Sequence, residues 1–410
     1  MRPARRSGTE PAFRSGTEPA RRSGTEPGWG GPIERLLAAK EIVICCGAGG
    51  VGKTTTAAAA ATMASVSLGG TVLVLTVDPA RRLADALGLE ALGNVETRVP
   101  DDALAAAGVE ARGELWAAML DTKQSWDDLV RSHAPDARTV ERILENPLYQ
   151  NVSGRFVQSH EYIAMERLYE IHRSGRFDLI VVDTPPTRNA LDFLAAPDRM
   201  ADFFSSRLLR WITRPARSRL VNMATRPFYQ AADRILGSQF LQDVAEFFLL
   251  FQTMYPGFVE RANAVKQLLR DRRTTFVVVT TLEAAPVREA EFFLGALADQ
   301  GLHRGALVLN RVLPAYLLDA RAARVAERLA AAPPELSEAL ADAGRAPTVA
   351  RVLREVGESY RNFSVVAARE SELRAELSPA ADVVVSVPSF ETDIFDLDGL
   401  LRLGRALWEG

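Results

Sequence analysis

The chain has 410 residues with a formal net charge of −3 at pH 7, and 47% of its residues are hydrophobic and 25% charged. This composition supplies a large core, and the small negative charge argues against the basic surface that nucleic-acid binding needs. No apolar run reaches the length of a membrane span, and the arginines near the N-terminus precede no apolar stretch. We therefore expect neither a transmembrane segment nor a secretory signal.

The first 32 residues differ in composition from the rest of the chain. The pentapeptide Ser-Gly-Thr-Glu-Pro occurs at Ser7–Pro11, Ser15–Pro19 and Ser23–Pro27, each time after an arginine. A short repeat rich in Gly, Pro and Ser cannot bury enough apolar surface to fold. We expect residues 1–32 to be a disordered tail, and we favour a solvated extension over a docking or membrane-surface tail. Residues 33–410 are expected to form the folded domain.

The most specific motif follows the apolar run Ile42–Cys46. From Gly47 to Thr54 the chain fits the phosphate-loop pattern G-x-x-x-x-G-K-[ST]. Glycines let successive N–H groups point at phosphate oxygens, and the N-terminus of the following helix favours anions. We expect Lys53 to reach the β- and γ-phosphates of a nucleoside triphosphate and the Thr54 hydroxyl to hold Mg²⁺. The expected nucleotide contacts are Gly49, Gly50, Val51, Gly52, Lys53, Thr54 and Thr55.

The only two cysteines, Cys45 and Cys46, end the strand that enters this loop. Neighbouring residues on a strand point to opposite faces, so the two are poorly placed to form a disulfide with each other. A reduced, cytoplasmic protein is expected. The four histidines are scattered without ligand spacing, so we expect no Cys/His metal site.

A strand–helix alternation begins after Ile33. Continuous apolar, Val-rich runs are typical of parallel strands that are covered on both faces. The pattern predicts an α/β fold, a doubly wound and mainly parallel sheet of the P-loop NTPase type, with the phosphate loop at the carboxyl end of its first strand. The expected strands are Ile42–Cys46, Thr71–Val77, Leu179–Val182, Thr275–Thr280, Ala306–Leu309 and Val383–Val387.

Two segments are too long for simple crossovers, at about residues 101–174 and 197–271. We expect them to form one helical subdomain inserted over the nucleotide face. The second contains an apolar stripe at helical spacing. We interpret the stripe as core in preference to a client-binding groove; its members are Phe240, Leu241, Val244, Phe247, Phe248, Phe251 and Met254.

Two carboxylates follow strands and complete the expected nucleotide site. Asp183 ends the apolar strand from Leu179, a pattern that holds Mg²⁺ through its water shell when it is coupled to a phosphate loop. Asp78 follows the strand from Thr71 and is placed to act as a general base or to position water, in preference to a role that only caps a turn.

Three motifs together resemble the ArsA-type ATPases. They are the phosphate loop, Thr-Val-Asp-Pro-Ala-Arg-Arg-Leu-Ala-Asp-Ala-Leu at Thr76–Leu87, and Asp-Thr-Pro-Pro-Thr-Arg-Asn-Ala-Leu-Asp-Phe-Leu at Asp183–Leu194. This family includes the arsenite-pump ATPase and the ATPase that targets tail-anchored proteins. The resemblance covers residues 33–410 in motif order.

The resemblance implies an ATP- and Mg²⁺-dependent dimer whose two nucleotide sites face each other. It places Asp78 in the first switch segment and Asp183 at the start of the second. By position, Asn310 matches the asparagine that contacts adenine, and Pro388 matches a loop after the last strand that also serves the nucleotide.

Three departures from the family narrow the function. The family carries a second lysine early in the loop that reaches the partner's phosphates, and this chain has Ala48 there. The insert has no cysteines for arsenite, and the chain has no Cys-x-x-Cys pair for a zinc site at the dimer interface.

The leading hypothesis is an ATPase that couples hydrolysis to dimer opening and closing, for a client protein or a membrane-associated process. The alternative is a regulatory subunit that binds ATP but hydrolyses it poorly, which the missing lysine at Ala48 motivates. A DNA-partitioning ATPase is disfavoured by the charge and the insert. A heterodimer with a lysine-bearing paralogue is favoured over a homodimer, in which Arg81, Arg82 or Arg188 would have to replace the lysine.

Overall fold

The computed structural model describes residues 30–77, 82–152, 159–185, 243, 246–247, 249–250, 254–340 and 345–410. The tail expected at residues 1–32 lies outside the described residues, apart from its last three. Most of the insert expected at 197–271 also lies outside them, with much of its apolar stripe.

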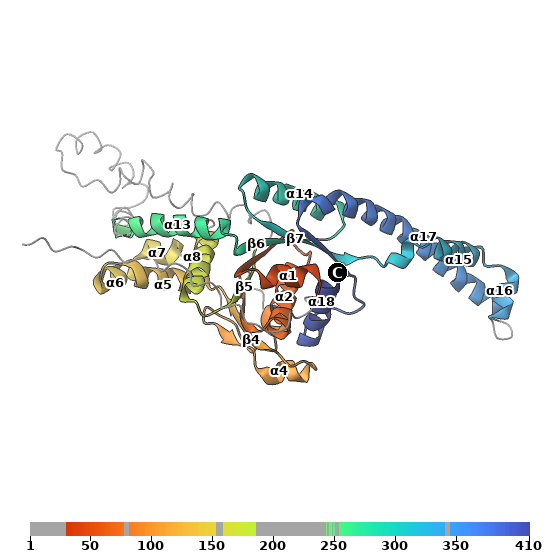
Figure 1. Ribbon diagram of the computed structural model, residues 1–410, viewed down its shortest axis with the longest axis horizontal. Coiled ribbons are helices and arrows are strands. Elements are labelled where there is room, and N and C mark those ends of the chain that lie inside the picture. The colour runs from red at the N-terminus through yellow and green to blue at the C-terminus, as the bar shows by residue number, and fades with distance from the viewer. Residues whose placement is uncertain are drawn as a thin grey trace, which may run out of the picture.

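An eight-stranded sheet forms the centre of the molecule (Figure 1), with strand order β3-β4-β2-β5-β1-β6-β7-β8. All neighbouring strands are parallel except β3 and β4, which are antiparallel. The strands are β1 (Ile42–Cys46), β2 (Gly70–Thr76), β3 (Thr97–Arg98), β4 (Gly113–Met119), β5 (Leu179–Asp183), β6 (Thr274–Thr280), β7 (Arg304–Val312) and β8 (Val383–Pro388). All six strands predicted from the sequence are present, and the predicted α/β class is confirmed.

Strand β4 corrects the prediction of a helical segment starting at about residue 101. Gly113–Met119 pairs with β2 at seven consecutive positions, and β3 pairs with its other edge. The alanines and Glu114 in this stretch give it little of the strand-forming composition that the other strands have. The extended conformation of β4 is therefore determined by its pairing along the whole of β2. Before β4 lies the short helix α4 (Asp101–Ala106), and the helical region proper begins with α5 (Thr122–His133).

Helices cover both faces of the sheet, as a doubly wound fold requires (Figure 1). One face packs on α1 (Pro32–Ala38), α2 (Lys53–Ser67) and α18 (Leu397–Glu409). The other packs on α5, α8 (Ser159–Ser174), α13 (Tyr255–Arg270) and α14 (Ala284–Asp299). Cys45 belongs to the first core and Cys46 to the second, and both are free thiols. Their opposite orientation on β1 is as predicted.

The other helices of the described ranges lie beside α5, after β2 and between β7 and β8. Helices α6 (Ala137–Glu145) and α7 (Pro147–Val152) extend the layer that contains α5, and the short α3 (Arg82–Ala86) follows β2. Between β7 and β8 lies an insertion that the sequence analysis did not anticipate: η1 (Ala315–Leu318), α15 (Ala320–Ala331), α16 (Pro334–Ala339), α17 (Ala346–Leu377) and η2 (Ser378–Ala380). Helices α15 and α17 pack against each other and project from the body (Figure 1); we call residues 315–377 the arm.

The length and apolarity that a membrane-crossing helix needs are not combined in any helix of the described part of the chain.

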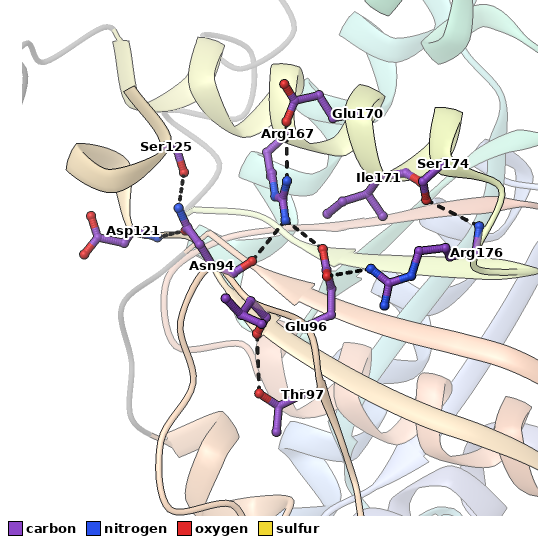
Figure 2. A network of polar contacts seen from close by, with 11 residues as sticks. Asn94, Glu96, Thr97, Asp121, Ser125, Arg167, Glu170, Ile171, Ser174 and Arg176 are labelled. Atoms are coloured by element: carbon purple, nitrogen blue, oxygen red, sulfur yellow. Dashed lines mark hydrogen bonds and ion pairs between the residues drawn. The ribbon is translucent and has the colours of Figure 1, made fainter. Parts of the chain in front are cut away.

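A polar network joins the helical layer to the segment between α3 and β3 (Figure 2). The Glu96 carboxylate accepts hydrogen bonds from Arg167 Nη2 at 2.7 Å and Arg176 Nη1 at 3.0 Å. Arg167 Nη2 also donates to the Asn94 carbonyl at 3.1 Å, and Asn94 Nδ2 donates to Ser125 Oγ at 2.8 Å. The network therefore fixes α5 and α8 against the segment between α3 and β3.

Replacing Glu96 with Ala is expected to lower the free energy of unfolding by about 2 kcal/mol, because the partly buried Arg167 loses its 2.7 Å carboxylate contact and keeps only the longer one to Glu170 at 3.4 Å. The Glu96 side chain is only 9% exposed. Asp128→Ala is the matched control, since Asp128 and its partner Arg131 are both 53% exposed. Its expected loss is within about 0.5 kcal/mol. Urea denaturation measures both, and equal losses would contradict the assignment.

Candidate functional site

The phosphate loop runs from Gly47 to Gly52, between the end of β1 and the start of α2. Gly52 has φ +94°, in the left-handed region, and a Cβ there would lie 2.4 Å from Asn310 Nδ2. A Cβ on Gly47 would lie 2.0 Å from the carbonyl oxygen of Val279 on β6. Both positions therefore require glycine. At Gly52 the reasons are the backbone conformation and the contact with Asn310, and at Gly47 the reason is the close approach to β6.

Asp183 lies at the centre of the site. It is the last residue of β5, and its register partners are Cys45 on β1 and Thr76 on β2. The Thr54 hydroxyl donates to Asp183 Oδ2 at 2.6 Å, and the Thr76 hydroxyl donates to the same oxygen at 3.0 Å. The side chain is completely buried. The structure thus brings together Thr54 and Asp183, the two residues expected from the sequence to serve a Mg²⁺ ion.

Lys53 is the first residue of α2 and is almost fully buried. Its Nζ donates to the carbonyl oxygen of Ala48 at 2.8 Å, so the ammonium lies over the loop that it closes. Ala48, the second residue of the loop, is itself buried. In the described conformation the loop thus holds its one lysine close to its own backbone.

Asn310 contacts the phosphate loop directly from β7. Its Nδ2 donates to the Val51 carbonyl at 2.8 Å, and its Oδ1 accepts from the Arg311 backbone N–H at 3.0 Å. Arg311 has φ +59°, and the β7–β8 register shifts beside it. Pro388 ends β8, exposed and in register with Val312. The sequence placed Asn310 near the nucleotide but gave no sign of its bond to Val51.

Some predicted residues lie outside the described residues: Asp78, Arg81 and Arg188. Strand β2 ends at Thr76, two residues before Asp78, and α3 begins at Arg82. Gly49 and Gly50 are exposed at the turn of the loop.

Two threonines of the site were missed by the sequence analysis. Besides Thr76, the Thr184 hydroxyl donates to the Cys45 carbonyl at 2.8 Å and holds the residue after Asp183 against β1. The sequence signal that could have identified Thr76 is a hydroxyl residue at the end of an otherwise apolar strand, in Leu75-Thr76-Val77.

The two cysteine thiols beside the loop are buried, which disfavours the thiolate form. Burial raises the pKa of Cys45, and the nearby Asp183 carboxylate raises it further. Burial also raises the pKa of Cys46. Since the thiolate is the nucleophile and the metal ligand, neither residue is available for either role.

The donor set fits Mg²⁺. A hydroxyl and a carboxylate oxygen are the hard ligands that this ion prefers, and it usually takes one or two protein ligands beside water and substrate phosphates. Within the described ranges, no group of three His, Cys, Asp or Glu residues is placed to hold a metal ion by itself. A site with few protein ligands is therefore the kind that Thr54 and Asp183 provide.

Comparison with known proteins finds a matching family model and similar curated proteins. A family model described as anion-transporting ATPase matches residues 40–331. The "Putative arsenical pump-driving ATPase" of Chlorobaculum tepidum is 25% identical over 258 residues, which cover 60% of this chain and 55% of the relative. The "Putative arsenical pump-driving ATPase 2" of Aquifex aeolicus is 25% identical over 246 residues, 60% of this chain and 72% of the relative. The chain thus spans about half the length of the first relative.

Gly52→Ala is expected to destabilise the nucleotide-free protein more than Gly50→Ala. Both glycines have positive φ, so both variants bear about 1 kcal/mol of backbone strain. Only at Gly52 does the new Cβ meet the Asn310 amide, whose bond to Val51 is worth about 1 kcal/mol. Thermal unfolding measures the difference. Equal melting temperatures for the two variants would show that the Asn310 contact contributes nothing.

Proposed function

The chain belongs to the ArsA family of anion-transporting ATPases, and we propose that it hydrolyses ATP to ADP and phosphate with Mg²⁺ bound at this site. The observation that carries the proposal is the 2.6 Å contact between the Thr54 hydroxyl and the Asp183 carboxylate. A phosphate loop alone only binds anions. Hydrolysis also needs a carboxylate that serves the metal, and here it lies against the loop's own threonine.

Each residue has a role in this proposal. The loop N–H groups and Lys53 bind and neutralise the β- and γ-phosphates. Thr54 and Asp183 would hold Mg²⁺, which would supply positive charge to stabilise the transferring phosphoryl group. Asp78 orients the attacking water as general base. Asn310 recognises adenine: it retains one N–H and one lone pair beyond its bonds to Val51 and Arg311.

The proposal includes a dimer that opens and closes with the nucleotide state and acts on a client protein or a membrane-associated process. Its support is the family membership and the motifs at Asp78 and Asp183. Arsenite is not the proposed substrate, although two relatives are named for arsenical pumps. The only two cysteines of this chain are buried in β1, with thiols that burial keeps protonated.

A second candidate is a regulatory subunit that binds ATP and turns it over slowly. The buried Ala48 favours it, because no second lysine of the loop is available to the partner's phosphates. Loss of a cation that stabilises the transferring phosphoryl group lowers turnover by orders of magnitude. The two candidate functions predict the same ATP binding but different rates of ATP hydrolysis.

Lys53→Ala is expected to abolish tight ATP binding, because the ammonium is the main charge on the β- and γ-phosphates. Asp78→Asn is expected to leave binding largely intact and to lower turnover by about a hundredfold or more, since the amide cannot accept a proton. Calorimetry and phosphate release separate the two effects. Wild-type turnover in Asp78→Asn would remove the residue from the mechanism.

Asn310→Ala is expected to weaken ATP binding and to reduce the preference for ATP over GTP, because an amide can pair with the edge of adenine through both a donor and an acceptor. Competition binding with the two nucleotides checks this. An unchanged ratio would move base recognition elsewhere, with the loop at Pro388 as the next candidate.

The missing lysine predicts low turnover by the purified chain alone. Addition of an ArsA-type paralogue that has the early lysine is expected to raise turnover by about tenfold or more, because the partner's lysine completes this chain's site. Most hydrolysis then occurs at this chain's site, and Lys53→Ala in this chain removes it. Rapid turnover by the lone chain, lost on Arg188→Ala, would support an arginine substitute and contradict the heterodimer.

A further inference from the structure

Helix α17 carries two series of residues at coiled-coil spacing. The first we call the inner seam: Leu353, Gly357, Tyr360, Ser364 and Ala367, with steps of four and three residues. It is occupied by α15. A Cβ on Gly357 would lie 2.5 Å from the Ala326 carbonyl oxygen and the Ala330 nitrogen, and the Tyr360 hydroxyl donates to the Tyr316 carbonyl at 2.9 Å. These contacts show that α15 and α17 are antiparallel and closely packed.

The second series has the same spacing and larger side chains. We call it the outer seam of α17: Val352, Val356, Ser359, Phe363 and Val366. Its four apolar members are 47%, 51%, 53% and 49% exposed. An isolated hairpin needs only one seam per helix, so large apolar residues on a second seam are typical of a helix with two partners.

Helix α15 has a matching outer seam of Ala322, Val325 and Leu329, in which Val325 is 54% exposed. On each helix the outer seam lies about 100° around the axis from the face that contacts the other helix. On both helices each outer-seam residue comes one position before a residue that faces the other helix, so the rotation has the same sense on both. Because the helices are antiparallel, equal offsets place both outer seams on the same side of the hairpin. The arm therefore presents one continuous apolar face made by two helices.

Charged residues at the edges of this face are self-complementary. The edge beside the α17 outer seam has Glu355, and the edge beside the α15 outer seam has Arg321 and Arg328. Gly357 packs between Ala326 and Ala330, so Arg328 lies close to the level of Glu355, on the opposite edge of the arm. Glu355 has only an exposed contact with Arg351 at 3.9 Å. Within the described residues, Arg321 and Arg328 form no ion pair.

We propose that the arm pairs with the arm of a second copy of this chain, forming a four-helix bundle about a twofold axis parallel to the arm. This axis puts α15 of each copy over α17 of the other and buries all four outer seams. It also brings Arg328 of each copy to Glu355 of the other. The pairing requires neither nucleotide nor ATP hydrolysis, and it is separate from the proposed nucleotide-face dimer.

Sedimentation velocity of the full chain without nucleotide, over a range of concentrations, tests the apolar face. The wild type is expected to self-associate. The double variant Val356→Lys/Phe363→Lys is expected to weaken association by about tenfold or more. Val365→Lys is the control, because Val365 is 71% exposed and belongs to neither seam. Its association is expected to match the wild type. All three positions are exposed, and circular dichroism checks that each variant folds.

A charge-reversal experiment tests the geometry. Arg328→Glu and Glu355→Arg are each expected to associate weakly alone, because like charges then meet on both sides of the axis. An equimolar mixture of the two variants is expected to recover association, because each new charge meets its opposite. A monomeric wild type, an unaffected seam variant or a mixture no stronger than its components would each overturn the proposal.

Discussion

A single buried carboxylate determines how the site is assembled. Asp183 is fully buried, and burial of a carboxylate is costly unless hydrogen bonds compensate for lost water. Thr54 and Thr76 provide those bonds from α2 and β2. Since β5 lies between β1 and β2, Asp183 lies beside both the start of α2, directly after the phosphate loop, and the end of β2, from which the chain continues toward Asp78. The hydrogen bonds of Asp183 therefore depend on the strand order and on the position of the phosphate loop together.

Much of this arrangement could be predicted from the sequence, because the responsible features are local. The glycines of the loop, the Lys53-Thr54 pair and the Val-rich run before Asp183 each specify their own conformation. The missed features depend on contacts that are distant in sequence. Strand β4 is decided by its pairing with β2, and the bond of Asn310 to Val51 joins residues that are 259 positions apart. The arm was not predicted, although the length of chain between β7 and β8 was the available signal.

Buried carboxylates also hold the helices of the helical layer to their neighbours. Glu96 pairs with Arg167 of α8 and with Arg176 just after this helix, and Glu166, next to Arg167 on α8, pairs with Arg261 of α13. Tyr162 donates to the same carboxylate at 2.8 Å. Burial raises the pKa of Glu166, and the neighbouring Arg261 opposes the shift. Paired buried charges contribute little net stability but are costly to separate, so they fix which helices are neighbours. The helical layer is thus held in one arrangement above the sheet.

The central claim is that Asp183 serves a Mg²⁺ ion on a nucleotide bound at Lys53 and Thr54. Calorimetric titration of ATP into the wild type and Asp183→Ala, each with and without Mg²⁺, tests it most directly. The account predicts that Mg²⁺ tightens ATP binding to the wild type and has little effect on the variant. The same effect of Mg²⁺ on both proteins, or no ATP binding by the wild type, would contradict it.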